Sequence, residues 1–178
     1  MKSWLLCIVI VLSLMGTSNA QGNMAVGAGV VVSLPIGDFG DAANTGFGGT
    51  AAFEMSFLPQ LTGVGNIGYI TWGTDVDEVS FSAVPILAGV KYYFMPGVGF
   101  YGLGQLGLTI MSTEIPTFSF GGMTFGGGSE SSTEFTFVIG AGYEVPVSPN
   151  FLLDFSGAFN VISDANHIAL RAGGKLAL

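Results

Sequence analysis

Apolar and polar residues alternate every two positions along most of this chain. In residues 133–146, one row reads Phe, Phe, Ile, Ala, Tyr, Val and the opposite row reads Glu, Thr, Val, Gly, Gly, Glu. A period of two places successive side chains on opposite faces of a β-strand, and no later segment has a convincing helical stripe. The pattern predicts eight strands, at residues 24–34, 46–58, 61–72, 79–95, 99–112, 133–146, 150–162 and 167–178.

The predicted connections alternate between long and short. The second, fourth and sixth are tight, and each contains a proline, at Pro59, Pro96 and Pro149. Long loops at one end and short turns at the other are typical of outer-membrane barrels. The longer connections, odd in order, cover residues 35–45, 73–78, 113–132 and 163–166.

Alternation alone does not say which row faces outward, because a soluble lipid-carrying barrel would turn its apolar row inward. The opposite row consists mainly of Gly, Ala, Ser and Thr, which suit the narrow interior of an eight-stranded barrel. Aromatic residues of the apolar row gather near the segment ends, as in the two aromatic belts of a lipid-facing surface. We therefore predict an all-β, eight-stranded antiparallel up-and-down transmembrane β-barrel.

Pro85 lies inside the fourth predicted strand, where a closed barrel has no free edge for a residue without an N–H donor. We expect a β-bulge at this position. Residues 86–95 would then form the part of the strand that crosses the lipid.

Composition agrees with a membrane protein that carries little charge. Charged residues make up 9% of the chain, against about 25% in soluble domains, and the mean hydropathy is +0.64. Residues 1–20 read as a cleaved secretory signal peptide, because an apolar run of about 12 residues precedes a small-x-small site before Gln21. Cys7, the only cysteine, lies inside that run. One domain, residues 21–178, remains for the barrel.

The charged residues separate into two groups. Most acidic residues lie in the long connections, where no Lys or Arg accompanies them. Because a buried charge is costly unless it is paired, the inward-facing group predicts a salt-bridge network that plugs the lumen; the alternative is a gate or an ion path. Six charges point inward by parity: Glu54, Lys91, Glu144, Asp154, Arg171 and Lys175.

Two motifs resemble catalytic or nucleotide-binding patterns. Gly102–Gly107 matches G-x-G-x-x-G, but no helical period follows it, so we do not expect a nucleotide site. Ser163, Asp164 and His167 bring three residue types of nucleophilic catalysis within five positions, a set that a polar loop also produces by chance. His167 is the only histidine, so an enzyme at the barrel rim would have to use it.

Two connections are candidate binding segments. Asp75, Asp77 and Glu78 offer hard oxygen ligands for weak cation binding at the outer rim, although they lack the glycine and spacing of an EF-hand. A solvated acidic loop is the competing interpretation. The connection at 113–132 is the longest and is rich in glycine; it would either bind a partner or fold as a hairpin above the membrane. We predict no metal centre and no cofactor.

Four stretches carry a family resemblance: Val84–Phe94, Phe100–Gly104, Gly140–Tyr143 and the final strand. Through them the chain resembles the small outer-membrane β-barrel proteins of Gram-negative bacteria, the OmpA/OmpX-like group. The resemblance implies an eight-stranded barrel inserted by the outer-membrane assembly machinery, which reads the last strand. Members usually end on an aromatic residue, whereas this chain ends on Leu178. No catalytic residue carries over.

These observations predict a non-enzymatic integral protein of the cell outer membrane, with a structural or surface-interaction role and at most a narrow pore. We expect a monomer that contacts outer-membrane lipid and the assembly machinery. Nucleic acid is not an expected partner, because only three basic residues follow Lys2. The alternatives are an outer-membrane lipid-modifying enzyme that uses His167 and a soluble lipid-binding β-barrel.

Overall fold

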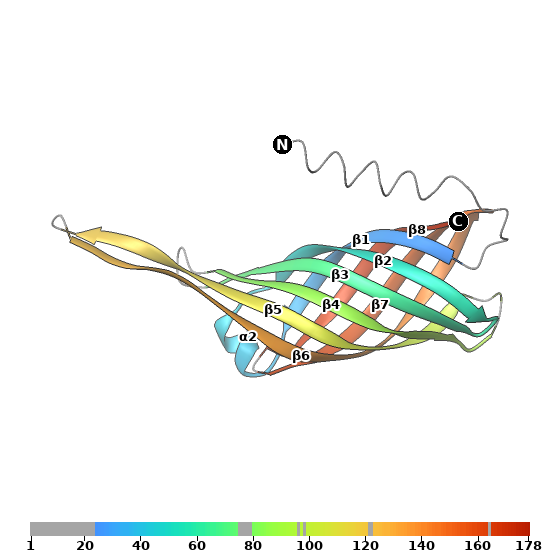
Figure 1. Ribbon diagram of the computed structural model, residues 1–178, viewed down its shortest axis with the longest axis horizontal. Coiled ribbons are helices and arrows are strands. Elements are labelled where there is room, and N and C mark those ends of the chain that lie inside the picture. The colour runs from blue at the N-terminus through green and yellow to red at the C-terminus, as the bar shows by residue number, and fades with distance from the viewer. Residues whose placement is uncertain (1–23, 75–79, 96, 98, 121–122, 164) are drawn as a thin grey trace.

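The chain forms a closed antiparallel barrel of eight strands, in which each strand pairs with its neighbours in sequence order (Figure 1). This confirms the predicted fold class. The computed structural model describes residues 24–74, 80–95, 97, 99–120, 123–163 and 165–178, so the predicted signal peptide lies outside the described residues and stays a prediction. The strands are β1 (Met24–Pro35), β2 (Gly46–Leu58), β3 (Leu61–Gly73), β4 (Ser80–Tyr93), β5 (Phe100–Phe120), β6 (Met123–Ser148), β7 (Phe151–Ile162) and β8 (His167–Ala177).

The first and last strands close the barrel. β1 pairs with β8 from Ala25↔Ala177 to Pro35↔His167, and the Leu178 N–H donates to the Met24 carbonyl at 2.9 Å. Within the barrel wall, closure gives every strand a partner on both sides and leaves no free edge. The barrel therefore has two ends: a turn end, which holds Met24 and the C-terminus, and a loop end, which holds the long connections.

Tight turns join the strands at the turn end. The only two register irregularities between described strands lie here, at Ser56/Leu58 and Pro146/Ser148. Gly99 has a φ of 81°, and a side chain there would run into the Glu144 carbonyl. Glycine is the residue that adopts this left-handed conformation without strain, and here it also allows the close approach of β6.

Two features differ from the sequence prediction at the loop end. β5 and β6 continue through most of the predicted connection at 113–132. This connection therefore forms a hairpin, which was one of its two predicted interpretations. A five-residue helix, α2 (Asp38–Ala42), lies in the first long connection and places Phe39 in a buried position. None of the helices in the described part of the chain is long and apolar enough to cross a membrane.

The bulge expected at Pro85 is wrong. The β3–β4 pairing keeps one register from Ile67↔Ile86 to Ile70↔Ala83, and the β4–β5 pairing runs through Pro85 itself. Gly68 explains how the strands accommodate the Pro85 ring without a change of register. A Cβ at that position would lie only 3.3 Å from the proline ring, so glycine makes room for the ring and the strand does not need an extra residue.

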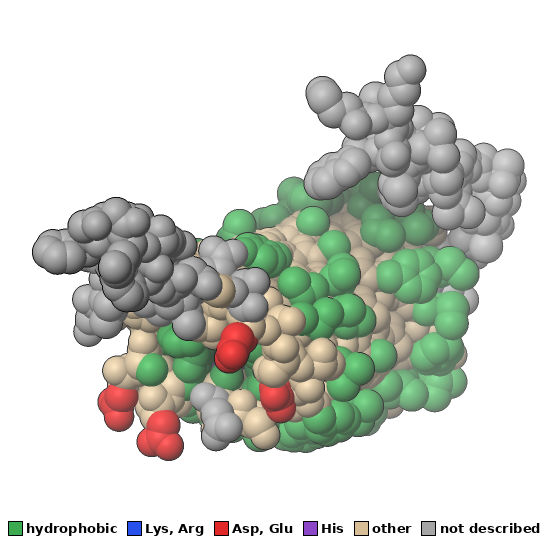
Figure 2. Space-filling view, turned by 60° about the vertical axis from the view of Figure 1, so that its left-hand side comes forward, with side chains coloured by type: hydrophobic (Ala, Val, Ile, Leu, Met, Phe, Trp, Pro, Cys, Tyr) green, Lys and Arg blue, Asp and Glu red, His purple; other side chains and the backbone are tan. Residues whose placement is uncertain are grey.

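The outer wall of the barrel is apolar. Figure 2 shows hydrophobic side chains over the wall and acidic side chains at the loop end. The exposed aromatic and aliphatic residues include Phe47, Ile67 and Phe135, which are 60%, 51% and 64% exposed. The charged and polar row points inward. This arrangement is the reverse of a soluble lipid-carrying barrel, and it is the surface that lipid requires.

Candidate functional site

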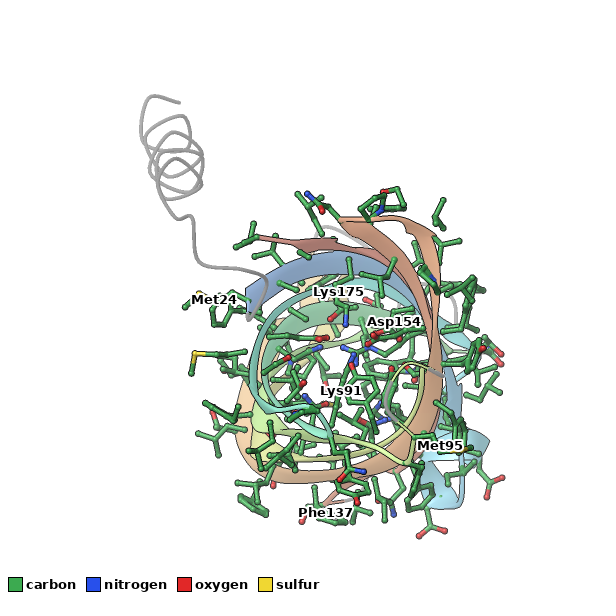
Figure 3. All side chains as sticks on the ribbon, turned by 90° about the vertical axis from the view of Figure 1, so that its right-hand side faces the viewer. Met24, Lys91, Met95, Phe137, Asp154 and Lys175 are labelled. Carbon is green, nitrogen blue, oxygen red and sulfur yellow. The ribbon has the colours of Figure 1, made fainter. Side chains whose placement is uncertain are left out.

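Five of the six inward charges meet in the lumen near the turn end. Figure 3 looks into that end and places Lys91, Asp154 and Lys175 inside the ring of strands, whereas Met24 and Phe137 lie outside it. Glu54, Lys91, Glu144 and Lys175 are buried, and Asp154 is partly so. The β6–β7 register sets Glu144 directly opposite Asp154. The inward row of the strands thus brings charged residues that are up to 121 positions apart in sequence into contact in the lumen.

The four most buried groups form a ring of alternating charge. Lys91 Nζ lies 2.7 Å from Glu54 and 3.1 Å from Glu144. Lys175 Nζ lies 2.9 Å from Glu54 and 2.6 Å from Glu144. Lys91 also contacts Asp154 at 2.6 Å. Each ammonium therefore has at least two carboxylate partners, which is the arrangement that compensates for the loss of hydration of buried charges.

Two tyrosines complete this cluster, and the sequence prediction did not include them. The Tyr93 hydroxyl donates to Glu144 at 2.8 Å, and the Tyr101 hydroxyl donates to Asp154 at 2.6 Å. Lys91 Nζ lies 4.3 Å from the centre of the Tyr101 ring, in cation–π range. Both tyrosines occupy inward positions of β4 and β5, so strand parity was the signal that could have found them.

The three carboxylates of the cluster are close enough to consider a metal ion. One oxygen each from Glu54, Glu144 and Asp154 lies within 4.8 Å of the others. The ammonium groups of Lys91 and Lys175 already lie against these oxygens and supply the cationic charge. A metal ion would have to displace them, so the arrangement fits a structural plug better than a metal centre.

Arg171 is the predicted network residue that the structure does not bring into an ion pair. Its guanidinium donates to the Thr50 hydroxyl at 2.8 Å, and no carboxylate of the described residues lies within 4.0 Å. Arg171 lies four residues before Lys175 along β8, two inward positions nearer the loop end. It therefore belongs to the middle of the lumen.

An apolar cluster fills the lumen at the loop end. Trp72 is fully buried, its Nε1 donates to Ser33 at 3.0 Å, and Phe39 of α2 packs edge-on against it at 5.4 Å. Gly46 leaves the room that the indole ring needs, because a Cβ there would lie 2.4 Å from it. The buried members of this loop-end plug are Val31, Phe39, Ala43, Ile70, Trp72, Ala83, Ile162, Ala165 and Ala169.

His167 packs into the loop-end plug. The residue is 3% exposed, its ring packs against Trp72 at 5.5 Å, and its Nδ1 lies 3.1 Å from the Ala165 carbonyl. Ser163 is exposed, and Asp164 lies outside the described residues. The glycine motif Gly102–Gly107 lies within β5, with no helix after it to bind a phosphate.

The proposed rim cation ligands Asp75, Asp77 and Glu78 lie outside the described residues, so that site stays a prediction.

No protein-family model matches the chain, and no curated protein matches it in sequence. Solved structures match its fold. Ail, the attachment invasion locus protein of Yersinia pestis, is 17% identical with a TM-score of 0.63, over 88% of this chain and 99% of Ail. Neisserial surface protein A is 17% identical with a TM-score of 0.57, over 88% and 97% of the two chains.

The N-terminal barrel domain of Pseudomonas aeruginosa OprF is 15% identical with a TM-score of 0.52, over 89% of this chain and all of that one. These matches cover 88–89% of this chain. They agree with the resemblance drawn from the sequence and with the apolar outer wall. The chain therefore has the fold of the small eight-stranded integral β-barrels of the outer membrane.

Proposed function

We propose that this protein is a non-enzymatic outer-membrane barrel that serves as a closed anchor and presents the β5–β6 hairpin outside the cell. The observation that carries the proposal is a contrast in strand length. β5 and β6 have 21 and 26 residues, whereas the other strands have 11 to 14. A membrane-spanning strand needs only about 9–11 residues.

The excess length forms a two-stranded arm. β5 pairs with β4 only as far as Glu114, and β6 pairs with β7 only from Thr136. Beyond Glu114, the partner of β5 among the described residues is β6 alone, from Ile115↔Gly128 to Phe120↔Met123. We call residues 115–128 the arm; its six residues per strand project by about 20 Å, away from the barrel in Figure 1.

The arm offers a way to bind a partner. A strand that lacks a neighbour on its outer side has free N–H and C=O groups, which an extended peptide can pair with. An isolated two-stranded ribbon is also only marginally stable, so a partner that adds a strand would stabilise it. We therefore favour the surface-interaction role over a purely structural one.

The distribution of charge argues against one class of partner. Ail has been crystallised with the heparin analogue sucrose octasulfate, a polyanion. In this chain the three basic residues that follow Lys2, which are Lys91, Arg171 and Lys175, all lie on inward positions of the barrel. Nothing at the loop end would pair with sulfate groups, so we do not extend polyanion binding to this protein.

The filled lumen supports at most a narrow pore. An ion would have to pass the charged ring near the turn end and then the plug around Trp72. The burial of His167, which is 3% exposed and packs against Trp72, disfavours a lipid-modifying enzyme, because a buried ring is out of reach of a lipid substrate. The predicted partners, outer-membrane lipid and the assembly machinery, and the monomeric state belong to this proposal.

The test uses an epitope tag inserted between Phe120 and Met123 of the protein expressed in a Gram-negative host. We expect antibody labelling of intact cells, a gel-mobility shift between unheated and boiled samples, and recovery with outer membranes. Planar-bilayer recordings should lack a large, stable conductance.

A matched variant with the arm replaced by a short turn should insert equally well and lose the label. Recovery in the soluble periplasm, or labelling only after permeabilisation, would contradict the proposal.

A further inference from the structure

Two small cavities lie in the middle of the lumen, between the charged ring and the loop-end plug. Their volumes are about 50 and 30 Å³. They adjoin each other at four shared lining residues, and we call the two cavities together the chamber. The shared residues are Thr50, Asn66, Gln105 and Arg171.

Two side chains of the chamber, Gln105 and Arg171, have N–H donors without a partner among the described residues. Gln105 is 2% exposed, and its Nε2 has no hydrogen-bond partner among the described residues. Arg171 carries five N–H donors, of which the structure uses one, to Thr50. Thr50 also accepts from Asn66 Nδ2 at 2.9 Å. An unpaired buried donor costs free energy, so a bound acceptor that reaches both groups would stabilise the folded barrel.

The charges around the chamber also differ from those at the turn-end mouth. The larger cavity is lined by three basic residues and two acidic ones, the acids being Glu54 and Asp154. The smaller one is lined by Arg171 as its only charge. The mouth below the ring, about 420 Å³, is lined by Glu54, Glu144 and Lys175. In the wall of the larger cavity, Lys91 and Lys175 are already paired with carboxylates of the ring. Arg171 is therefore the basic residue of the chamber that has no ion-pair partner among the described residues.

We propose that the chamber binds a small monovalent inorganic anion of the halide class, held by the Arg171 guanidinium and the Gln105 amide. A cavity of this size has room for one or two particles as large as water, whose share of liquid volume is about 30 Å³, and so excludes organic anions. A charged acceptor gives stronger hydrogen bonds to these donors than a neutral one. The proposal goes beyond the role of the arm and does not depend on it.

The test compares anions at equal ionic strength. The purified barrel is refolded in detergent in the sodium salt of chloride, bromide or gluconate, and its thermal transition is followed by the gel-mobility shift. A ligand that binds only the folded state raises the transition temperature until the site saturates. We expect a saturable rise with chloride and bromide and none with gluconate, and an anomalous bromide peak in the chamber of crystals grown in bromide.

Three variants assign the effect to the chamber. Gln105→Glu would supply an internal carboxylate to Arg171, so its transition should no longer depend on chloride. Gln105→Leu should weaken the dependence. Thr136→Val is the matched control: it breaks a buried hydroxyl pair, Thr109–Thr136 at 2.7 Å, outside the chamber, and should keep the dependence. Equal behaviour in chloride and gluconate, a water in place of the bromide peak, or an unchanged chloride response in Gln105→Glu would overturn the proposal.

Discussion

The two ends of the lumen are closed by opposite chemistry. Near the turn end, Lys91 and Lys175 alternate with carboxylates in a ring of ion pairs. Near the loop end, Trp72 and Phe39 close the lumen by apolar volume, and Trp72 donates a hydrogen bond to Ser33. The charged end depends on every partner being present, because an uncompensated buried charge is expensive. The apolar end depends on shape and can tolerate changes that preserve volume.

The lengths of the connections explain the difference. The loop between β1 and β2 is long enough to fold α2 back over the lumen, and Phe39 enters the plug from it. The turns at the other end are too short to reach inward, as the two residues Pro59 and Gln60 between β2 and β3 illustrate. That end must be filled by strand side chains alone. Long side chains with charged ends span a lumen that short apolar ones would leave hollow.

The largest effect is expected from Lys91→Met. The substitution keeps most of the side-chain volume but leaves Glu54, Glu144 and Asp154 with Lys175 as the only ammonium of the cluster. Loss of one partner from a buried ion pair costs about 3–5 kcal/mol. The measurement is urea unfolding of the barrel in lipid vesicles, read as the free energy of unfolding.

Lys175→Met is the matched control for this prediction. Lys175 contacts two carboxylates and Lys91 contacts three, so its loss should cost less. Neutralising Glu54 and Asp154 to amides in the Lys91→Met background should recover part of the stability. If Lys91→Met were as stable as the natural chain, the ring would not be what closes the turn end.

The second effect concerns the loop end. Trp72→Ala removes the largest fully buried side chain and leaves the Ser33 hydroxyl without its donor. Truncation of a buried aromatic residue costs about 3–5 kcal/mol, and we expect the lower value because this end can admit water. Trp72→Phe keeps a ring and loses mainly the hydrogen bond, at about 1 kcal/mol.

The same unfolding experiment tests whether the two ends are independent. Distant sites without shared partners contribute additively within about 0.3–0.5 kcal/mol. The double variant Lys91→Met/Trp72→Ala should therefore lose the sum of the two single losses. A clear departure from additivity would mean that the two ends are energetically coupled, so that the lumen is closed by one plug and not by two independent ones.

Sequence reasoning located the strands and the inward row because a period of two is a local property. The strand bounds agree within a residue or two, apart from the long β5 and β6. The position of Arg171 could not be read this way, because contacts across the lumen depend on how far each strand is shifted along the barrel. The sequence pattern could not predict the buried position of Phe39, because a five-residue helix is too short to show a period and Phe39 is positioned by its contacts with Trp72 and Phe81.

Substitutions of His167 are expected to have the smallest effect. His167→Phe keeps the edge-to-face contact with Trp72 and loses the contact between Nδ1 and the Ala165 carbonyl, at about 1 kcal/mol. His167→Ala also loses the ring contact, which adds about 0.5–1.5 kcal/mol, together with buried volume. The difference between the two variants therefore measures what the ring contributes to the loop-end plug.

The His167 variants also separate the plug from the enzymatic alternative. Lipid A and phospholipid profiles of cells that carry His167→Phe or His167→Ala should match those of cells with the natural chain. A structural residue changes stability in proportion to what it packs against, whereas a catalytic one would abolish an acyl-transfer or hydrolytic product in both variants alike. An altered lipid profile in the more stable variant, His167→Phe, would thus indicate that His167 acts in catalysis and would contradict the assignment of the loop end as a structural plug.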